Sequence, residues 1–96
     1  MINVNKLRDY LVKEYDYPAF MVEKTIDKVE KFDSDIYHEF EHWLSSGEES
    51  GIQVEGYSIR MLIDKYKMNV VGAYLTLDWL KREPEDAKKA LLRGTK

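Results

Sequence analysis

Two histidines one helical turn apart form the pattern in this 96-residue chain that most suggests a reactive site. His38 and His42 enclose the string HEFEH, in which Glu39 follows the first histidine. Residues four apart on a helix lie on one face, so two such imidazoles can bind one zinc ion. A glutamate beside them can polarise a zinc-bound water molecule, which is the chemistry of a metal-dependent hydrolase.

The HEFEH string resembles the zinc-binding motif of the zincin metalloproteases, and the resemblance implies zinc ligation by His38 and His42. Other features oppose that function. Glu41 carries a charge where the family usually has a small or neutral residue, and no further histidine exists to act as the third ligand of a catalytic zinc. The apolar face of this segment centres on Phe40, so both histidines should face solvent. We therefore expect no metal site, keep the two histidines as weak metal candidates, and rank a zinc hydrolase third.

The stretch from Ser58 to Leu80 has the spacing of a helix-turn-helix. The pattern predicts a first helix to about Tyr66, a turn over residues 67–69 and a second helix from Val70. It resembles the modules of bacterial repressors, in which the second helix presents polar and basic residues to base edges. A nucleic-acid-binding regulator is therefore our second hypothesis. Its contacts would come from the basic residues of this region, which are Arg60, Lys65, Lys67, Lys81 and Arg82.

The second predicted helix lacks the surface of a DNA reader. Its sequence VVGAYLTLDWL is apolar in nearly every direction around the axis, and a helix of that kind is usually buried. We expect it to be the central helix of the second half. Gly72, with Ala73 beside it and Thr76 one turn later, should let another helix pack closely.

Composition and charge oppose several further classes of function. The chain has no cysteine, which excludes disulfides and thiolate metal sites. It has no phosphate-cradling glycine loop and no serine in a nucleophile motif, so we expect no catalytic residue and no cofactor. Residues 1–48 carry six Lys/Arg against eleven Asp/Glu, and residues 49–96 carry nine against seven. The acidic first half opposes binding to phosphates.

No apolar run approaches the roughly 20 residues that span a bilayer. The N-terminal sequence MINVNKLRDY carries charge where a signal peptide is apolar. We expect a cytoplasmic protein without membrane association.

Helix caps and helical spacings recur along the chain, whereas β signals are scarce, which predicts an all-α fold. We expect a compact bundle of five to six short helices in a single domain, 1–96, with two units, 1–47 and 52–96, joined by a polar loop. The predicted caps and helix-end residues are Asn3 or Asn5, Pro18, Asp33, Gly47, Ser58, Asn69, Pro84 and Gly94.

The predicted core gathers the large apolar residues of these helices. They are Phe32, Phe40, Trp43, Leu44, Leu62, Tyr66, Tyr74, Leu77 and Leu80. Trp43 and Trp79 follow the similar strings TIDK and LIDK, an echo between the halves that we attribute to chance. Both tryptophans are expected in or near the core, although a surplus of aromatic residues can also mark a partner site.

Two segments resemble known families. Tyr17–Gly47 resembles the three-helix ubiquitin-associated type of domain in its helix punctuation and in Trp43-Leu44 followed by a glycine, which implies a helix arrangement. It implies no binding residues, because Tyr17-Pro18-Ala19 replaces the glycine loop of the ubiquitin-binding members. Val54–Gly94 resembles small uncharacterised helical proteins of Gram-positive bacteria and their mobile elements through the strings EGY, GAY and LKREPEDA. This second resemblance implies a bacterial cytoplasmic setting.

These observations favour a non-enzymatic helical protein that acts through protein–protein contacts, as an accessory or adaptor. We expect a protein partner or self-association.

Overall fold

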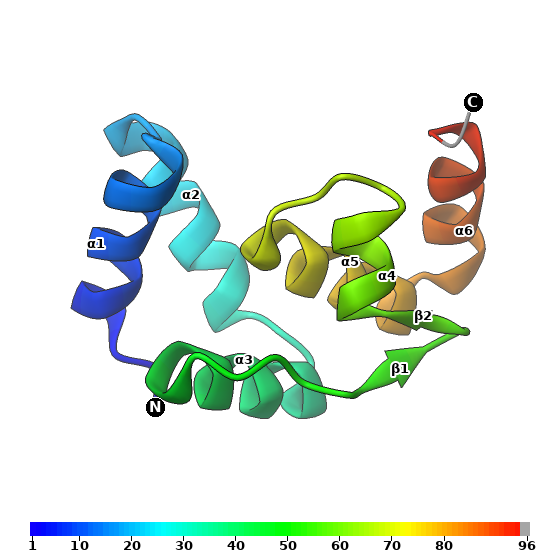
Figure 1. The fold of residues 1–96 in the computed structure, drawn as a ribbon, viewed down its shortest axis with the longest axis horizontal. Coiled ribbons are helices and arrows are strands. Elements are labelled where there is room, and N and C mark those ends of the chain that lie inside the picture. Colours follow the sequence, from blue (N-terminus) through cyan, green and yellow to red (C-terminus); the bar gives the residue numbers. More distant parts are fainter. Residues whose placement is uncertain (95–96) are drawn as a thin grey trace.

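The computed structural model describes residues 1–94, which form a helical molecule with one short hairpin (Figure 1). The predicted all-α fold is confirmed. In chain order the elements are α1 (Val4–Tyr15), α2 (Ala19–Glu30), α3 (Ser34–Ser46), β1 (Gln53–Val54), β2 (Tyr57–Ser58), α4 (Ile59–Asp64), α5 (Val70–Arg82) and α6 (Pro84–Arg93).

The helices begin and end close to the predicted caps. The side chain of Asn3 accepts a hydrogen bond from the N–H of Lys6 at 3.0 Å, which settles the choice between Asn3 and Asn5. Asn69 caps α5 in the same way, through a 2.7 Å bond from the N–H of Gly72. Gly47 ends α3 with φ of +79°, a left-handed conformation that glycine adopts without strain.

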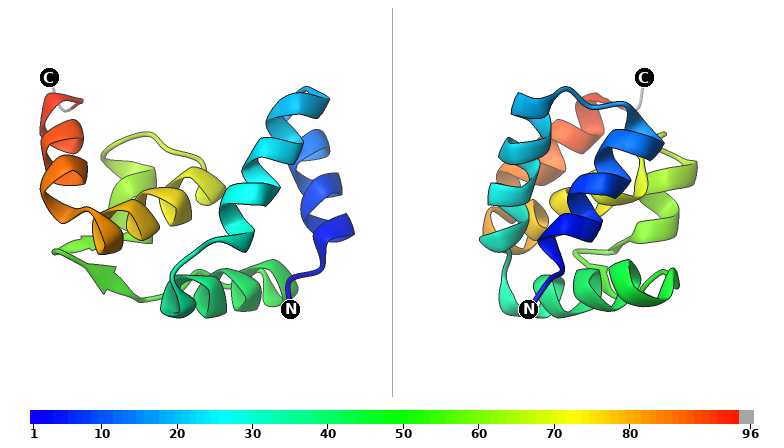
Figure 2. Two further views of the ribbon diagram at one scale, coloured as in Figure 1. Left: turned by 180° about the vertical axis from the view of Figure 1, so that it is seen from behind. Right: turned by 90° about the vertical axis from the view of Figure 1, so that its left-hand side faces the viewer.

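The two halves share one core. Helices α1 and α2 stand side by side, α3 runs along the base beneath them, and α4, α5 and α6 occupy the other side (Figures 1 and 2). Phe40 of α3 meets Tyr74 of α5 edge-on with ring centroids 5.2 Å apart, and Trp43 lies 6.0 Å from the same tyrosine. The N–H of Asp33 also donates to the carboxylate of Asp78 at 2.7 Å. Aromatic packing and a buried acceptor therefore join α3 to α5.

A short β-hairpin precedes α4. Val54 pairs with Tyr57 and Gln53 with Ser58 in antiparallel register. The two turn residues between them, 55 and 56, both have positive φ, as a tight hairpin turn requires. The hairpin delivers Ser58 to the start of α4, where its side chain accepts from the N–H of Met61 at 3.1 Å.

The first helix of the helix-turn-helix region is shorter than predicted. Helix α4 ends at Asp64 rather than near Tyr66. Lys67 takes a left-handed conformation, with φ of +61°, and the N–H of Met68 donates back to the carbonyl of Leu62 at 3.2 Å. The chain therefore turns sharply before α5, although the sequence has no glycine there.

The predicted core is confirmed except at its edges. Tyr66 is only half-buried and packs against the core, whereas the other predicted core residues are buried. Trp79 is 38% exposed, so unlike Trp43 it is not one of the buried residues of the core. Gly72 does not receive a neighbouring helix either. A Cβ atom there would lie 3.0 Å from Oδ1 of Asn69, so the glycine leaves room for the α5 cap.

Within residues 1–94 we find no helix with both the length and the apolar character needed to cross a membrane.

Candidate functional site

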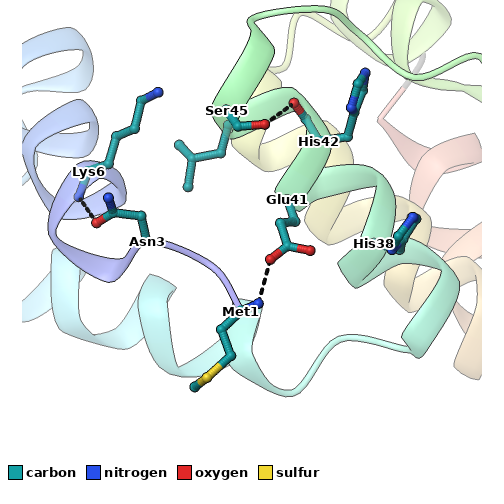
Figure 3. Close-up of a pocket in the computed structure, with 8 residues that line it drawn as sticks. Met1, Asn3, Lys6, His38, Glu41, His42 and Ser45 are labelled. Atoms are coloured by element: carbon teal, nitrogen blue, oxygen red, sulfur yellow. Dashed lines mark hydrogen bonds and ion pairs between the residues drawn. The ribbon is translucent and has the colours of Figure 1, made fainter.

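Both histidines of HEFEH lie on the exposed edge of α3, while Phe40 between them is fully buried. They line an open hollow of about 440 Å³ between α3 and the N-terminal segment. In Figure 3 the carboxylate of Glu41 points toward the amino group of Met1, and the rings of His38 and His42 point away from it. The complete lining is Met1, Asn3, Lys6, His38, Glu41, His42, Leu44 and Ser45.

The carboxylates near the histidine pair have other partners. Glu39, which would polarise the water of a hydrolase, accepts a hydrogen bond from the hydroxyl of Ser50 at 2.7 Å. Glu41 pairs with the amino group of Met1 at 2.7 Å, and this hydrogen bond lowers the pKa of Glu41. No group of three His, Cys, Asp or Glu side chains that could hold a metal ion occurs among residues 1–94. The histidine edge therefore lacks the ligand set of a catalytic zinc.

The basic residues of the helix-turn-helix region are largely engaged with carboxylates. Arg60 pairs with Glu49, and with Asp64 at 3.0 Å. Lys81 lies 3.2 Å from Asp33 and 2.6 Å from Asp35. Phosphates would have to displace these carboxylates.

The other three basic candidates are scattered. Arg82 pairs with Asp78 within α5. The ammonium group of Lys65 lies 5.7 Å from the ring centre of Tyr66. Lys67 is exposed at the left-handed turn. Within residues 1–94, only Lys65 and Lys67 of the five candidates therefore have no carboxylate partner, and two free cations are few for phosphate contacts.

Helix α5 is the central helix of its half, as predicted. Its fully or nearly fully buried residues are Val71, Ala73, Tyr74, Leu77, Asp78 and Leu80. The outward stripe consists of Leu75, Trp79 and Arg82, which follow one another at intervals of four and three residues. This stripe faces α2 and carries only one cation, which does not suit a recognition helix.

The surface between α2 and α5 was not predicted from the sequence. Two adjoining hollows, of about 290 and 360 Å³, share Lys28 and Leu75 as lining residues. Figures 1 and 2 show the start of α5 beside α2. We call the joined hollows the α2–α5 groove. It is lined by Phe20, Met21, Lys24, Thr25 and Lys28 from α2 and by Leu75, Thr76, Asp78, Trp79 and Arg82 from α5.

The α2–α5 groove exposes large apolar side chains. Phe20 is 72% exposed, Trp79 38% and Met21 36%. Phe20 and Met21 directly precede the buried stripe of α2 that begins at Val22. Two apolar residues placed just outside an amphipathic stripe were the available sequence signal for this surface.

The groove also carries cations without partners. Lys24 and Lys28 have no carboxylate partner among the described residues, although Lys31, which directly follows α2, pairs with Asp27 at 3.1 Å. Asp78 is buried and is already occupied, because it accepts from Arg82 as well as from the N–H of Asp33. The groove therefore combines exposed apolar groups with uncompensated positive charge.

Comparison with known proteins assigns no family. The chain matches no family model, and no curated protein or solved structure is significantly similar to it. The likenesses of Tyr17–Gly47 and Val54–Gly94 to known families therefore stay predictions.

Proposed function

We propose that this protein is a non-enzymatic accessory or adaptor that binds another protein through the α2–α5 groove. One observation carries the proposal: large apolar side chains are exposed at both hollows of the groove, Phe20 and Met21 at one and Trp79 at the other, and the two hollows share Lys28 and Leu75. Folded proteins rarely leave large apolar groups gathered at one place unless a partner covers them.

The residue types of the groove suit a protein partner. Aromatic residues and methionine are enriched in protein–protein interfaces, and a tryptophan near the centre often dominates the binding energy. Methionine adapts its shape to a partner because its side chain is unbranched and polarizable. A groove between two helices is also a common receptor for a third helix.

The two competing functions have less support. A nucleic-acid regulator would need free basic residues, yet Arg60, Lys81 and Arg82 are paired with carboxylates. A zinc hydrolase would need Glu39 beside the histidine pair, and that side chain is bound to Ser50.

Site-specific photo-crosslinking tests the proposal. A photoreactive phenylalanine analogue is placed at Phe20 or Trp79 and, as a control, at Val12, which is 48% exposed on α1 and lies outside the groove lining. In an extract of the source organism, we expect both groove probes to form the same protein adduct and the control to form none. Adding Trp79→Ala to the Phe20 probe should abolish that adduct. Equal labelling from all three positions, or none from the groove, would contradict the proposal.

A further inference from the structure

We infer that the α2–α5 groove receives an acidic amphipathic helix. This inference rests on the proposed function, because it names the partner of the same groove.

Each side of the groove is lined by residues of one helix. On α2 the stripe runs Phe20, Lys24, Lys28, at intervals of four residues. On α5 it runs Leu75, Trp79, at the same interval. The eight residue-to-residue steps of helix from Phe20 to Lys28 extend about 12 Å at 1.5 Å per residue. The groove is therefore about as long as two turns of a docked helix, which would present anchors at i, i+3 or i+4, and i+7.

The positive charge of the groove favours a docked helix with negative charge. The whole chain has a net charge of −3, yet Lys24 and Lys28 lie at the groove without a carboxylate partner in the described part of the chain. The neighbouring carboxylates of α2 are not free to pair with these two lysines, because Glu23 pairs with Arg8 at 2.8 Å and Asp27 pairs with Lys31. A partner with Asp or Glu beside its apolar anchors would supply the missing charges.

A second copy of the chain fits this surface less well. A twofold dimer through the groove would place the same patch on both sides. The positive charges of Lys24 and Lys28 would then be present on both sides of the interface, and like charges across an interface oppose association. The hollow shape favours a rod-like segment over a flat bilayer, and two free lysines are few for contacts along a phosphate backbone.

Peptide selection tests the inference without a known partner. A displayed library of random peptides roughly 15 residues long, enough for about four helical turns, is selected against the intact protein. Peptides that also bind the Phe20→Ala/Trp79→Ala variant are removed. We expect the enriched peptides to have excess Asp and Glu and apolar residues at i, i+3 or i+4, and i+7. Enrichment of neutral or basic peptides, or of none, would overturn the inference.

Charge reversal then tests the role of the two lysines. Lys24→Glu/Lys28→Glu should weaken binding of the selected peptides by about tenfold or more, since it places new carboxylates opposite the acidic residues of the peptide. The control variant Lys13→Glu/Lys89→Glu makes the same change of net charge on α1 and α6, and its affinity for the peptides should stay within about twofold of that of the natural protein. All four lysines lie on the surface, so we expect both variants to fold, and thermal melts that match that of the natural protein would establish this. Equal losses of peptide affinity in the two variants would contradict the inference.

The failure of this inference differs from the failure of the proposed function. If groove probes crosslink a protein but no acidic peptide is enriched, the partner chemistry is wrong and the function stands. If the groove probes crosslink only a second copy of the chain, the acidic partner is wrong as well. Binding of duplex DNA or of anionic lipid vesicles that requires Lys24 and Lys28 would also overturn the inference.

Discussion

The two tryptophans of this chain have similar sequence neighbours and opposite surroundings. Trp43 is 6% exposed and lies against Tyr10 and Phe40, with ring centroids 5.1 and 5.4 Å away. Trp79 is 38% exposed and lines the α2–α5 groove. Both residues are followed by a buried leucine on their helix. The difference therefore depends on which face of each helix is turned inward.

The apolar patterns of α3 and α5 differ in how well they predict which face of the helix is exposed. On α3 the apolar residues form one stripe, and Trp43 belongs to it. On α5 the apolar residues surround the axis, so the pattern does not identify the outward face. Asp78, beside Trp79, is turned into the protein, where it binds Asp33 and Arg82. Trp79 is therefore an apolar residue that the core leaves partly exposed, and our proposal assigns it to a partner.

The largest expected effect is on stability at Trp43. Trp43→Ala removes most of a buried aromatic side chain and should cost about 3–5 kcal/mol of unfolding free energy. Urea denaturation measures the loss, provided that the dependence of the unfolding free energy on urea concentration has the same slope in both proteins. The paired variant Trp79→Ala should cost about 1 kcal/mol or less, since its side chain is partly solvated already. Equal losses in the two variants would remove the distinction between them.

The order of the two tryptophans should reverse for binding. Trp79→Ala should weaken the groove partner by about 2 kcal/mol or more, because a large aromatic residue at an interface is a frequent hot spot. Leu92→Ala is the matched control, since Leu92 is 67% exposed on α6 and does not line the groove. Calorimetric titration with a selected peptide gives both values. Losses of the same size at the two positions would mean that the groove is not the docking site.

Asp78 should contribute to stability through its buried acceptor. Asp78→Ala leaves the N–H of Asp33 without its partner and should cost about 1–3 kcal/mol. Asp78→Asn keeps an acceptor oxygen and should cost less, while losing the ion pair with Arg82. Thermal unfolding of the two variants measures the difference. If Asn proves as costly as Ala, the ion pair matters more than the bond to α3.

Changes at the histidine edge of α3 should have little effect on stability. His38→Ala/His42→Ala should change the unfolding free energy by no more than about 0.5 kcal/mol, because both side chains are exposed. EDTA should leave the thermal melt of the natural protein unchanged. Stoichiometric zinc in the purified protein, together with peptidase activity that Glu39→Gln removes, would instead restore the zinc hydrolase hypothesis.

The smallest expected effect is on DNA binding. Phosphate contacts supply most nonspecific affinity, and few free cations lie in the helix-turn-helix region. Fluorescence anisotropy should detect no binding to random duplex DNA at physiological salt. Micromolar binding that falls steeply with salt and disappears in Lys65→Glu, Lys67→Glu or Lys81→Glu would favour the regulator instead.

Local features of the fold were predictable from the sequence, and the groove was not. Caps such as Asn3 and Asn69 act over three residues, so their positions can be inferred from the chain alone. The hairpin was missed because each strand has only two residues. The groove depends on how α2 and α5 are set against each other, which helical periodicity does not determine. Only the off-stripe positions of Phe20 and Met21 pointed to it.

One spectrum can test the central claim that the α2–α5 groove is the docking surface. In a ¹H–¹⁵N correlation spectrum the two tryptophans give separate indole N–H signals, which Trp79→Phe assigns. On addition of a selected acidic peptide, we expect the Trp79 signal to move progressively while the Trp43 signal stays in place, because only Trp79 lines the groove. A shift at Trp43 alone, or binding that leaves the Trp79 signal unmoved, would contradict the account.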